Sequence, residues 1–307
     1  MKWPAPPPSG AATLTYLEIN GWLLNAGGVT VLIDPILEGN LDFQLPFAYN
    51  AAKRVLPPSG LLQALPRLDA LLITQGLDDH AHDRTLEALA HIDPQLPVIA
   101  PPSARPVLQE RFQQIRYVTS RTRKLDLPYL GLDALPTVRL PSASSDVDRA
   151  TIAPRDGVAA AGEGLSVLAT SGALVGPPWQ KRENGYVIRP VAAGCAPSIY
   201  IEPHVEYDEA ELAVCAPVDA VVTPTSGQGL PGFELVHGPS ASIDLVRRLR
   251  PRWVLPMCNG AVDATGLSAP FIEAIGTEDE FERGLRAEGV AAEILEVRPG
   301  EPITLAL

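Results

Sequence analysis

Short apolar runs rich in β-branched residues alternate with glycine turns at the start of the chain. The runs Leu14–Ile19, Trp22–Leu24 and Val29–Ile33 are separated by turns at 20–21 and 27–28. β-branched residues favour strands, and asparagine–glycine or glycine–glycine pairs favour tight turns. The pattern therefore predicts an antiparallel meander.

The pattern then changes to strands that alternate with helices. It predicts a helical segment near 60–65, a strand at Leu68–Ile73, a helix over Asp83–His91, a strand at Val98–Ala100 and a helix over Ala104–Gln113. The first half of the chain thus combines hairpins with βαβ-like units.

The second half repeats this order of elements without repeating the sequence. Strands are expected at 166–170, 185–189, 198–201, 220–223, 253–256 and 292–297, and helices over 242–250 and 278–287. Ser242 stands in a capping position for the first of these helices. Two β-rich halves with added helices predict two sheets packed face to face with helices outside. We expect one domain over 11–307, preceded by a proline-rich tail at 1–10.

Charge and cysteine usage narrow the function. The 307 residues include 24 basic and 36 acidic side chains, and the net charge of −12 would repel nucleic acid and anionic membrane surfaces. Three cysteines without a CxxC pair favour reduced thiols. No apolar run reaches the roughly 18 residues that a membrane-spanning helix needs. We therefore expect a cytoplasmic protein with a small-molecule ligand or substrate, and no pattern predicts its oligomeric state.

The densest group of reactive side chains lies between a predicted buried strand and a predicted helix. The segment 74–82 contains Asp78, Asp79, His80 and His82. Loops at the carboxyl ends of strands form clefts, so these groups are candidates for metal binding or acid–base chemistry. The spacing leaves open the alternative that the two aspartates cap the following helix.

Three segments that lie far apart in the chain form a consistent set. They are the strand that ends in Ile33-Asp34-Pro35, the strand and loop with Thr74 and Asp79-His80, and Leu255–Gly260 after an amphipathic helix. In this order they resemble the metallo-β-lactamase fold, over nearly the whole chain. The resemblance implies an αββα sandwich of the α/β (α+β) class and a hydrolase-like function.

Four other segments suggest a branch of this superfamily: Asp34–Phe43, Gln75–His82, Gly176–Trp179 and Glu202–His204. The chain resembles the branch of ascorbate-6-phosphate lactonase-like and phospholipase-D-like hydrolases. Within that branch, it is similar to a cyanobacterial and chloroplast subgroup of unassigned function.

The resemblance also implies that the first metal site is lost. The family motif is Thr-His-x-His-x-Asp-His, in which the first two histidines hold one metal and the Asp-His pair holds a second. This chain has Gln75 and Leu77 in place of those histidines, and no histidine stands near 169–172, where a third is expected. Leucine cannot coordinate a metal, and an amide is a poor zinc ligand.

More of the second metal site is retained. Asp79 and His80 are present, Glu202 aligns with the bridging aspartate of the family, Cys258 aligns with its last histidine, and His204 is a further neighbour. Carboxylate, imidazole and thiolate groups can together hold one zinc ion. The alternative is a cleft without a metal, in which Asp79 and His80 hydrogen-bond to each other.

Other residues are expected around a substrate pocket. Gln75 and Leu77 would form a neutral floor beside the aspartates and histidines of the 74–82 segment. The rings of Phe43 and Trp179, on constrained loops, would line an apolar wall, with core packing as the alternative. His237, just before a helix, would reach the mouth of the site, unless it is simply a surface-loop histidine.

Two functions follow from these residues. The first is a single-metal hydrolase of an ester, lactone or phosphodiester, in which Asp79 and His80 are catalytic and Asp34 orients a metal-bound histidine, as in the family. The second is a metal-free pseudoenzyme that binds a small molecule or a protein. The sequence leaves both open, and with them the choice between one zinc ion and none.

Overall fold

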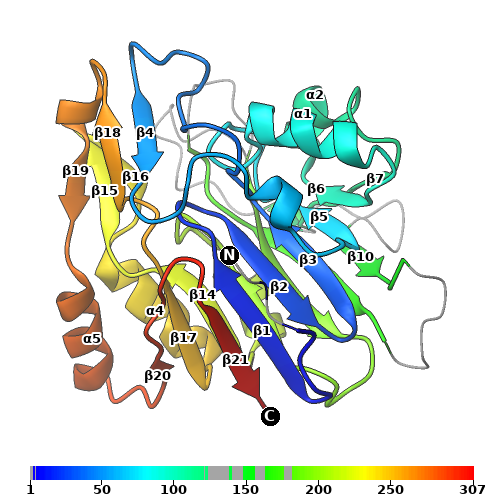
Figure 1. The fold of residues 1–307 in the computed structure, drawn as a ribbon. Coiled ribbons are helices and arrows are strands. Elements are labelled where there is room, and N and C mark those ends of the chain that lie inside the picture. Colours follow the sequence, from blue (N-terminus) through cyan, green and yellow to red (C-terminus); the bar gives the residue numbers. More distant parts are fainter. Residues whose placement is uncertain are drawn as a thin grey trace.

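The computed structural model describes residues 3, 5–120, 122–123, 138–139, 148–155, 163–175 and 182–307. Within these residues, two seven-stranded sheets lie face to face (Figure 1). Helices flank the pair on both outer sides, so the chain forms the expected αββα sandwich.

The first sheet carries the N-terminal meander and continues into parallel strands. Its order is β21 (Pro302–Ala306), β1 (Ala11–Tyr16), β2 (Trp22–Ala26), β3 (Val29–Ile33), β5 (Ala70–Leu72), β6 (Val98–Ala100) and β7 (Ile115–Tyr117). Strands β1, β2 and β3 pair antiparallel, in register from Tyr16 opposite Trp22 to Trp22 opposite Ile33. Strands β3, β5, β6 and β7 pair parallel, so their carboxyl ends meet at one edge.

The second sheet has the same mixed construction. Its order is β10 (Arg149–Ile152), β11 (Leu165–Ser171), β12 (Asn184–Pro190), β13 (Ile199–Ile201), β14 (Ala220–Pro224), β17 (Trp253–Met257) and β20 (Glu293–Ile294). The first four strands pair antiparallel, and the pairings of β13 with β14, β14 with β17 and β17 with β20 are parallel.

Helices and smaller sheets complete the described part of the chain. The helices are α1 (Asp83–Ile92), α2 (Arg105–Leu108), α3 (Glu209–Cys215), α4 (Pro239–Leu249) and α5 (Glu278–Ala287), with 3-10 turns η1 (Leu62–Ala64), η2 (Pro102–Ala104) and η4 (Ala269–Phe271). In the three-stranded sheet, β15 (Gly227–Leu230) pairs with β16 (Phe233–Val236) on one side and with β19 (Glu273–Ile275) on the other. The two-stranded sheets pair β18 (Val262–Thr265) with β4 (Asn50–Lys53) and β8 (Thr122–Arg123) with β9 (Val138–Arg139). None of the helices in the described residues has the length and apolar character to cross a membrane.

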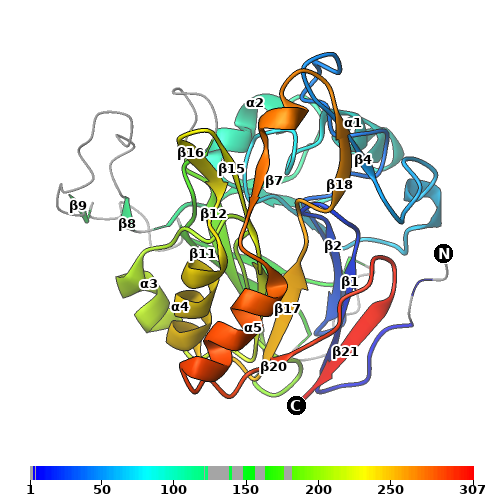
Figure 2. The same cartoon turned by 90° about the vertical axis from the view of Figure 1, so that its left-hand side faces the viewer.

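Three apolar clusters hold these layers together. The largest lies between the two sheets and includes Trp22, Tyr186 and Leu255. A second packs α1 and α2 against the outer face of the first sheet, and a third packs α3, α4 and α5 against the second sheet. Figure 2 shows these last three helices side by side. Burial on both faces explains why the central strands are nearly continuous apolar runs.

Two helices differ from the sequence prediction. The helix expected over Ala104–Gln113 is shorter, because α2 ends at Leu108. The helix α4 begins three residues before Ser242, with Gly238 as its N-terminal cap, so the capping position expected for Ser242 is wrong. The Ser242 hydroxyl is buried and donates a hydrogen bond to the Pro224 carbonyl at 2.5 Å. Ser242 thus joins α4 to the end of β14.

Candidate functional site

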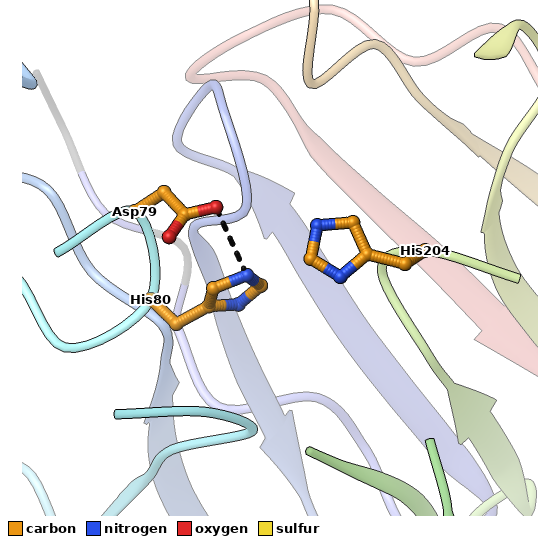
Figure 3. Close-up of side chains that lie close together, drawn as sticks. All are labelled: Asp79, His80 and His204. Atoms are coloured by element: carbon orange, nitrogen blue, oxygen red, sulfur yellow. Dashed lines mark ion pairs between the residues drawn. The ribbon is translucent and has the colours of Figure 1, made fainter. Parts of the chain in front are cut away.

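The loop between β5 and α1 separates the two neighbouring aspartates. The Asp78 carboxylate accepts hydrogen bonds from the backbone N–H of Asp83 at 2.9 Å and of Phe43 at 3.1 Å. Asp78 therefore satisfies an amide at the start of α1, as capping side chains do. Asp79 turns toward His80, with 3.2 Å between Asp79 Oδ2 and His80 Nε2 (Figure 3).

His80 is fully buried between two carboxylates. Its Nδ1 lies 2.9 Å from Asp34 Oδ2 and 2.8 Å from Thr74 Oγ1, while Nε2 faces Asp79. Burial opposes a positive charge on the ring, but the charges of Asp79 and Asp34 outweigh it and raise the pKa of His80 well above its usual value. Without a cation beside it, the two carboxylates therefore favour the imidazolium form of His80.

Asp34 is positioned by an uncommon backbone conformation. It follows β3 with a φ of +41°, in the left-handed region, where Asp is better tolerated than most residues. One carboxylate oxygen accepts the Thr74 N–H at 2.8 Å, and the other accepts the Thr74 hydroxyl and meets His80. Strain at this position is offset by these buried hydrogen bonds, which fix the orientation of the His80 ring.

His204 approaches His80 from the second sheet. It follows β13, and its ring meets that of His80 edge to face with centroids 5.0 Å apart. Its Nδ1 is hydrogen-bonded to the Glu183 carboxylate, so a metal ion would have to bind at Nε2. Burial, followed by the charge of His80, lowers the pKa of His204 to about 4. The ring is therefore neutral at pH 7, as a metal ligand must be.

Two buried glutamates complete the group. Glu183 precedes β12 and Glu202 follows β13, and both side chains are fully buried. Gly172 lies opposite Glu183, where a Cβ would come within 2.8 Å of Glu183 Cγ, so only a glycine leaves room for this side chain. Burial raises the pKa of both carboxyls well above the usual value, and the charge of Glu183 adds to the rise at Glu202. In the absence of a cation, burial therefore favours the protonated form of both carboxyls.

The donor groups fit a metal ion. Among the described residues, Asp79, His80 and His204 can place ligand atoms within 4.8 Å of one another, as can Glu183, Glu202 and His204. Asp79 Oδ1 and Glu183 Oε2 are buried without a hydrogen-bond partner. Two imidazoles and a carboxylate are a common set for zinc or iron. Each imidazole also has a carboxylate on Nδ1, the arrangement that orients metal-binding histidines.

A cavity of about 570 Å³ opens beside this group. Asp79 and His204 line its polar end, together with the amides of Asn20 and Asn259. Its remaining lining is largely apolar and comes from loops of both sheets and from β15, β16 and β18. Its size falls in the range of small-molecule sites.

Several predicted pocket residues line this cavity. Leu77 and Asp78 do, and so does Phe43, whose ring is 5.9 Å from that of Tyr49. Gln75 is buried just beneath and donates to the Val175 carbonyl at 3.3 Å. Trp179 lies outside the described residues.

The structure does not bring three other predicted residues into the group. Cys258 belongs to neither set of metal-ligating side chains among the described residues and packs against the core between the sheets. His82 is buried between Thr85, 2.8 Å from its Nδ1, and the Asn40 carbonyl. His237 is partly exposed and pairs with Glu234 at 2.8 Å. His237 therefore fits the alternative expectation of a surface-loop histidine better than a place at the mouth of the site.

Two polar residues of the site were not predicted from the sequence. Glu183 lies where β12 begins, next to the position at which the family has its third histidine. Asn20, in the turn after β1, donates to the Asp79 carbonyl at 3.0 Å and lies 3.3 Å from His80 Nε2. Both stand at an end of a predicted strand, and polar residues at strand ends are the signal that could have indicated them.

The comparisons with known proteins agree with this fold. Residues 13–258 match the family described as the beta-lactamase superfamily domain. The chain therefore belongs to this superfamily of metallo-hydrolases. No curated protein sequence matches it.

Solved structures share the fold at low sequence identity. Igni18, a metallo hydrolase from Ignicoccus hospitalis, is 16% identical, with 97% of this chain and 99% of that chain covered and a TM-score of 0.58. An isothiocyanate hydrolase from Delia radicum gut bacteria is also 16% identical, with coverage of 96% and 100% and a TM-score of 0.59. A possible metal-dependent hydrolase from Veillonella parvula is 14% identical, with coverage of 95% and 99% and a TM-score of 0.60.

Proposed function

We propose that this protein is a hydrolase that holds a single divalent metal ion, zinc, at Asp79, His80 and His204. The observation that carries the proposal is the pair of carboxylate–histidine contacts. Asp34 contacts Nδ1 of His80 and Glu183 contacts Nδ1 of His204, so both Nε2 atoms are left to bind the same metal ion. A divalent cation would also balance the charge of the buried carboxylates, which otherwise take up protons.

The loss of the first metal site is part of this proposal. Gln75 is buried and hydrogen-bonded to backbone, and Leu77 lines the cavity. Neither side chain offers an imidazole or carboxylate. We further propose that the chain belongs to the lactonase-like and phospholipase-D-like branch, in its cyanobacterial and chloroplast subgroup, and acts in the cytoplasm. The four sequence segments named above support membership of this branch. The three cysteines, which form no disulfide, support a location in the reducing cytoplasm.

Each part of the site has a defined role in this proposal. When bound, the metal would supply Lewis acidity to polarise the group under attack. Asp34 and Glu183 orient the two imidazoles, and Asn20 holds the loop of Asp79. The cavity binds the substrate and excludes water from the polar end, which strengthens electrostatic interactions there.

A second candidate is a metal-free binding module. It is favoured by the contacts of His80 with Asp34 on one side and Asp79 on the other, because these two carboxylates balance the positive charge of the ring without a metal. The same cavity would then bind a small molecule without turnover.

Metal content separates these two candidates. Protein purified without chelator should contain about one equivalent of a transition metal, and His204→Ala should contain less than about a tenth. His237→Ala is the matched control, because this histidine lies outside the site, and it should retain the metal. Hydrolysis of p-nitrophenyl esters should fall at least about 100-fold in His80→Ala. A native protein without metal, before and after reconstitution, would overturn the hydrolase proposal in favour of the binding module.

A further inference from the structure

The cavity beside the candidate metal group has a distinctive charge pattern. Its described lining residues include three aspartates, Asp78, Asp79 and Asp83, and no lysine or arginine. Nearby arginines are already paired, because Arg111 lies 2.6 Å from Asp83 and Arg84 lies 3.0 Å from Asp42. A phosphoryl group is normally stabilised by several cationic donors. The described part of this cavity does not supply them.

The remainder of the wall is apolar. Leu41, Leu77 and Val107 come from the side of the first sheet. On the side of the second sheet, Leu235 lies in β16 and Ile272 follows the 3-10 turn η4. An alkyl or aryl group placed here would leave water and gain about 25 cal/mol for each Å² buried. The volume of about 570 Å³ exceeds what the reacting group alone would need.

Apolar residues continue outward from the mouth of the cavity. Leu45 and Phe47 follow the lining residue Phe43, and Leu267 and Phe271 flank the lining residue Ser268. The two loops touch, since Leu267 N–H donates to the Phe47 carbonyl at 3.2 Å. Phe47 is 68% exposed and Leu267 72% exposed, so the rim offers an apolar path from solvent into the cavity.

We propose that the cavity selects a neutral carbonyl substrate with an apolar acyl group, and disfavours phosphodiesters. This inference rests on the proposed hydrolase function and narrows its substrate class. The acyl group would occupy the wall of Leu77 and Leu235, with the carbonyl at the end formed by Asp79 and His204. Attack of water on the carbonyl carbon would break the acyl–oxygen bond and release a carboxylic acid and an alcohol, so that atoms and charge balance.

A chain-length series tests the substrate class. We expect kcat/KM for p-nitrophenyl hexanoate to exceed that for the acetate by about tenfold or more, since each buried CH₂ contributes up to about fourfold. Bis(p-nitrophenyl) phosphate should be hydrolysed at less than about a hundredth of the hexanoate rate. A phosphodiester that is hydrolysed as well as the hexanoate, or an acetate preferred over it, would overturn the inference and leave the hydrolase function standing.

A charge-introducing variant adds a second test. Leu235→Arg places a cation in the wall, and the hexanoate-to-phosphodiester ratio of kcat/KM should fall at least about tenfold. Val214→Arg, on the exposed face of α3, is the matched control and should leave the ratio unchanged. An unchanged ratio in folded Leu235→Arg would contradict the proposed placement of the acyl group.

Binding of inert probes separates this inference from the hydrolase proposal. N-phenylhexanamide, which is neutral, should bind the native protein in calorimetry at least about tenfold more tightly than phenyl phosphate. If the amide binds with this preference and no ester is turned over, the hydrolase proposal fails and the selectivity of the cavity stands. If phenyl phosphate binds more tightly, or the amide does not bind, the inference fails.

Discussion

At the scale of single residues, Asp34 determines how His80 can be used. Its carboxylate meets the Nδ1 side of the ring, and Thr74 donates to the same carboxylate from its backbone and its hydroxyl. The ring can therefore turn neither way without losing a buried hydrogen bond. Asp79 meets the opposite nitrogen, so the ring presents Nε2 to the centre of the site.

We expect Asp34→Asn to weaken both stability and metal binding. The substitution removes one partner of a buried charge pair, which costs about 3–5 kcal/mol of unfolding free energy. It also frees the His80 ring, which should lower metal affinity about 10–100-fold. Urea unfolding and metal titration measure the two effects.

The matched control for this change is Asp263→Asn. Asp263 is paired with Arg54 at 2.9 Å but is exposed, so its loss should cost less than about 1 kcal/mol. Equal destabilisation by the two substitutions would contradict the role assigned to Asp34.

The sequence indicated some site residues and missed others for a physical reason. Asp79 and His80 are adjacent in a loop after a buried strand, so local pattern was enough to single them out. Glu183 becomes part of the site through the pairing of β11 with β12, which places Asn184 opposite Ser171. Cys258 aligned with a ligand position, yet its side chain is only partly buried and packs against the core. Convergence of side chains from two sheets is a property of the tertiary structure, which one sequence does not encode locally.

At the scale of elements, α5 shows how local signals can define a helix. It spans Glu278–Ala287, as predicted, and begins at a capping box in which Thr277 and Glu280 each bond the other's backbone. Its apolar face, with Phe281 and Leu285 buried, packs beside α4. Cap, charge and apolar spacing all agree, so the bounds follow from the sequence.

We expect Thr277→Ala to lower the free energy of unfolding by about 1 kcal/mol, because an N-terminal backbone amide loses its partner. Thr277→Ser keeps the hydroxyl and should recover most of this loss. Thermal and urea unfolding measure the change. An alanine variant as stable as the serine variant would show that the capping box does not stabilise α5.

Other elements depend on distant partners and were not predicted. Strand β21 pairs with β1, with Ala306 opposite Ala11 at the other end of the chain. The small strands β15, β16 and β18 contain glycines and charged residues, and they form by covering the cavity. Each is only four residues long, too short for its pattern to mark a strand, so only tertiary context reveals them.

At the scale of the whole molecule, the candidate site lies where the two sheets are joined. Tyr186 in the second sheet donates to the Ile73 carbonyl of the first at 2.8 Å, and the Asn184 N–H donates to the Thr74 carbonyl at 2.8 Å. Asp79 and His80 come from one sheet, and His204 comes from the other. A cation bound by all three would therefore link the two layers of the sandwich. Its binding would stabilise the whole fold and not only the site.

This arrangement predicts a pH-dependent effect of the metal. In the metal-free protein, the pKa values of Glu183, Glu202 and His80 are all raised, so above pH 6.5 the folded state binds more protons than the unfolded state. The free energy of unfolding must then fall as pH rises, by about 1.4 kcal/mol per pH unit for each proton. His204, with its pKa of about 4, acts in the opposite direction only below pH 6.5.

Metal binding should oppose this trend, because the ligands must be deprotonated and binding therefore strengthens with pH. We expect chelator-treated protein to lose about 1–3 kcal/mol of stability between pH 6.5 and 8, although Lys53, whose pKa is lowered to about 8, acts in the opposite direction near the upper end of this range. Zinc-loaded protein should lose less, so the stabilisation by metal grows over the same range. Urea unfolding of both forms at each pH measures it, and His204→Ala, which lacks a ligand, should show no gain from zinc. A metal effect that is constant or shrinks as pH rises would mean that the buried carboxylates and His80 do not exchange protons for the cation.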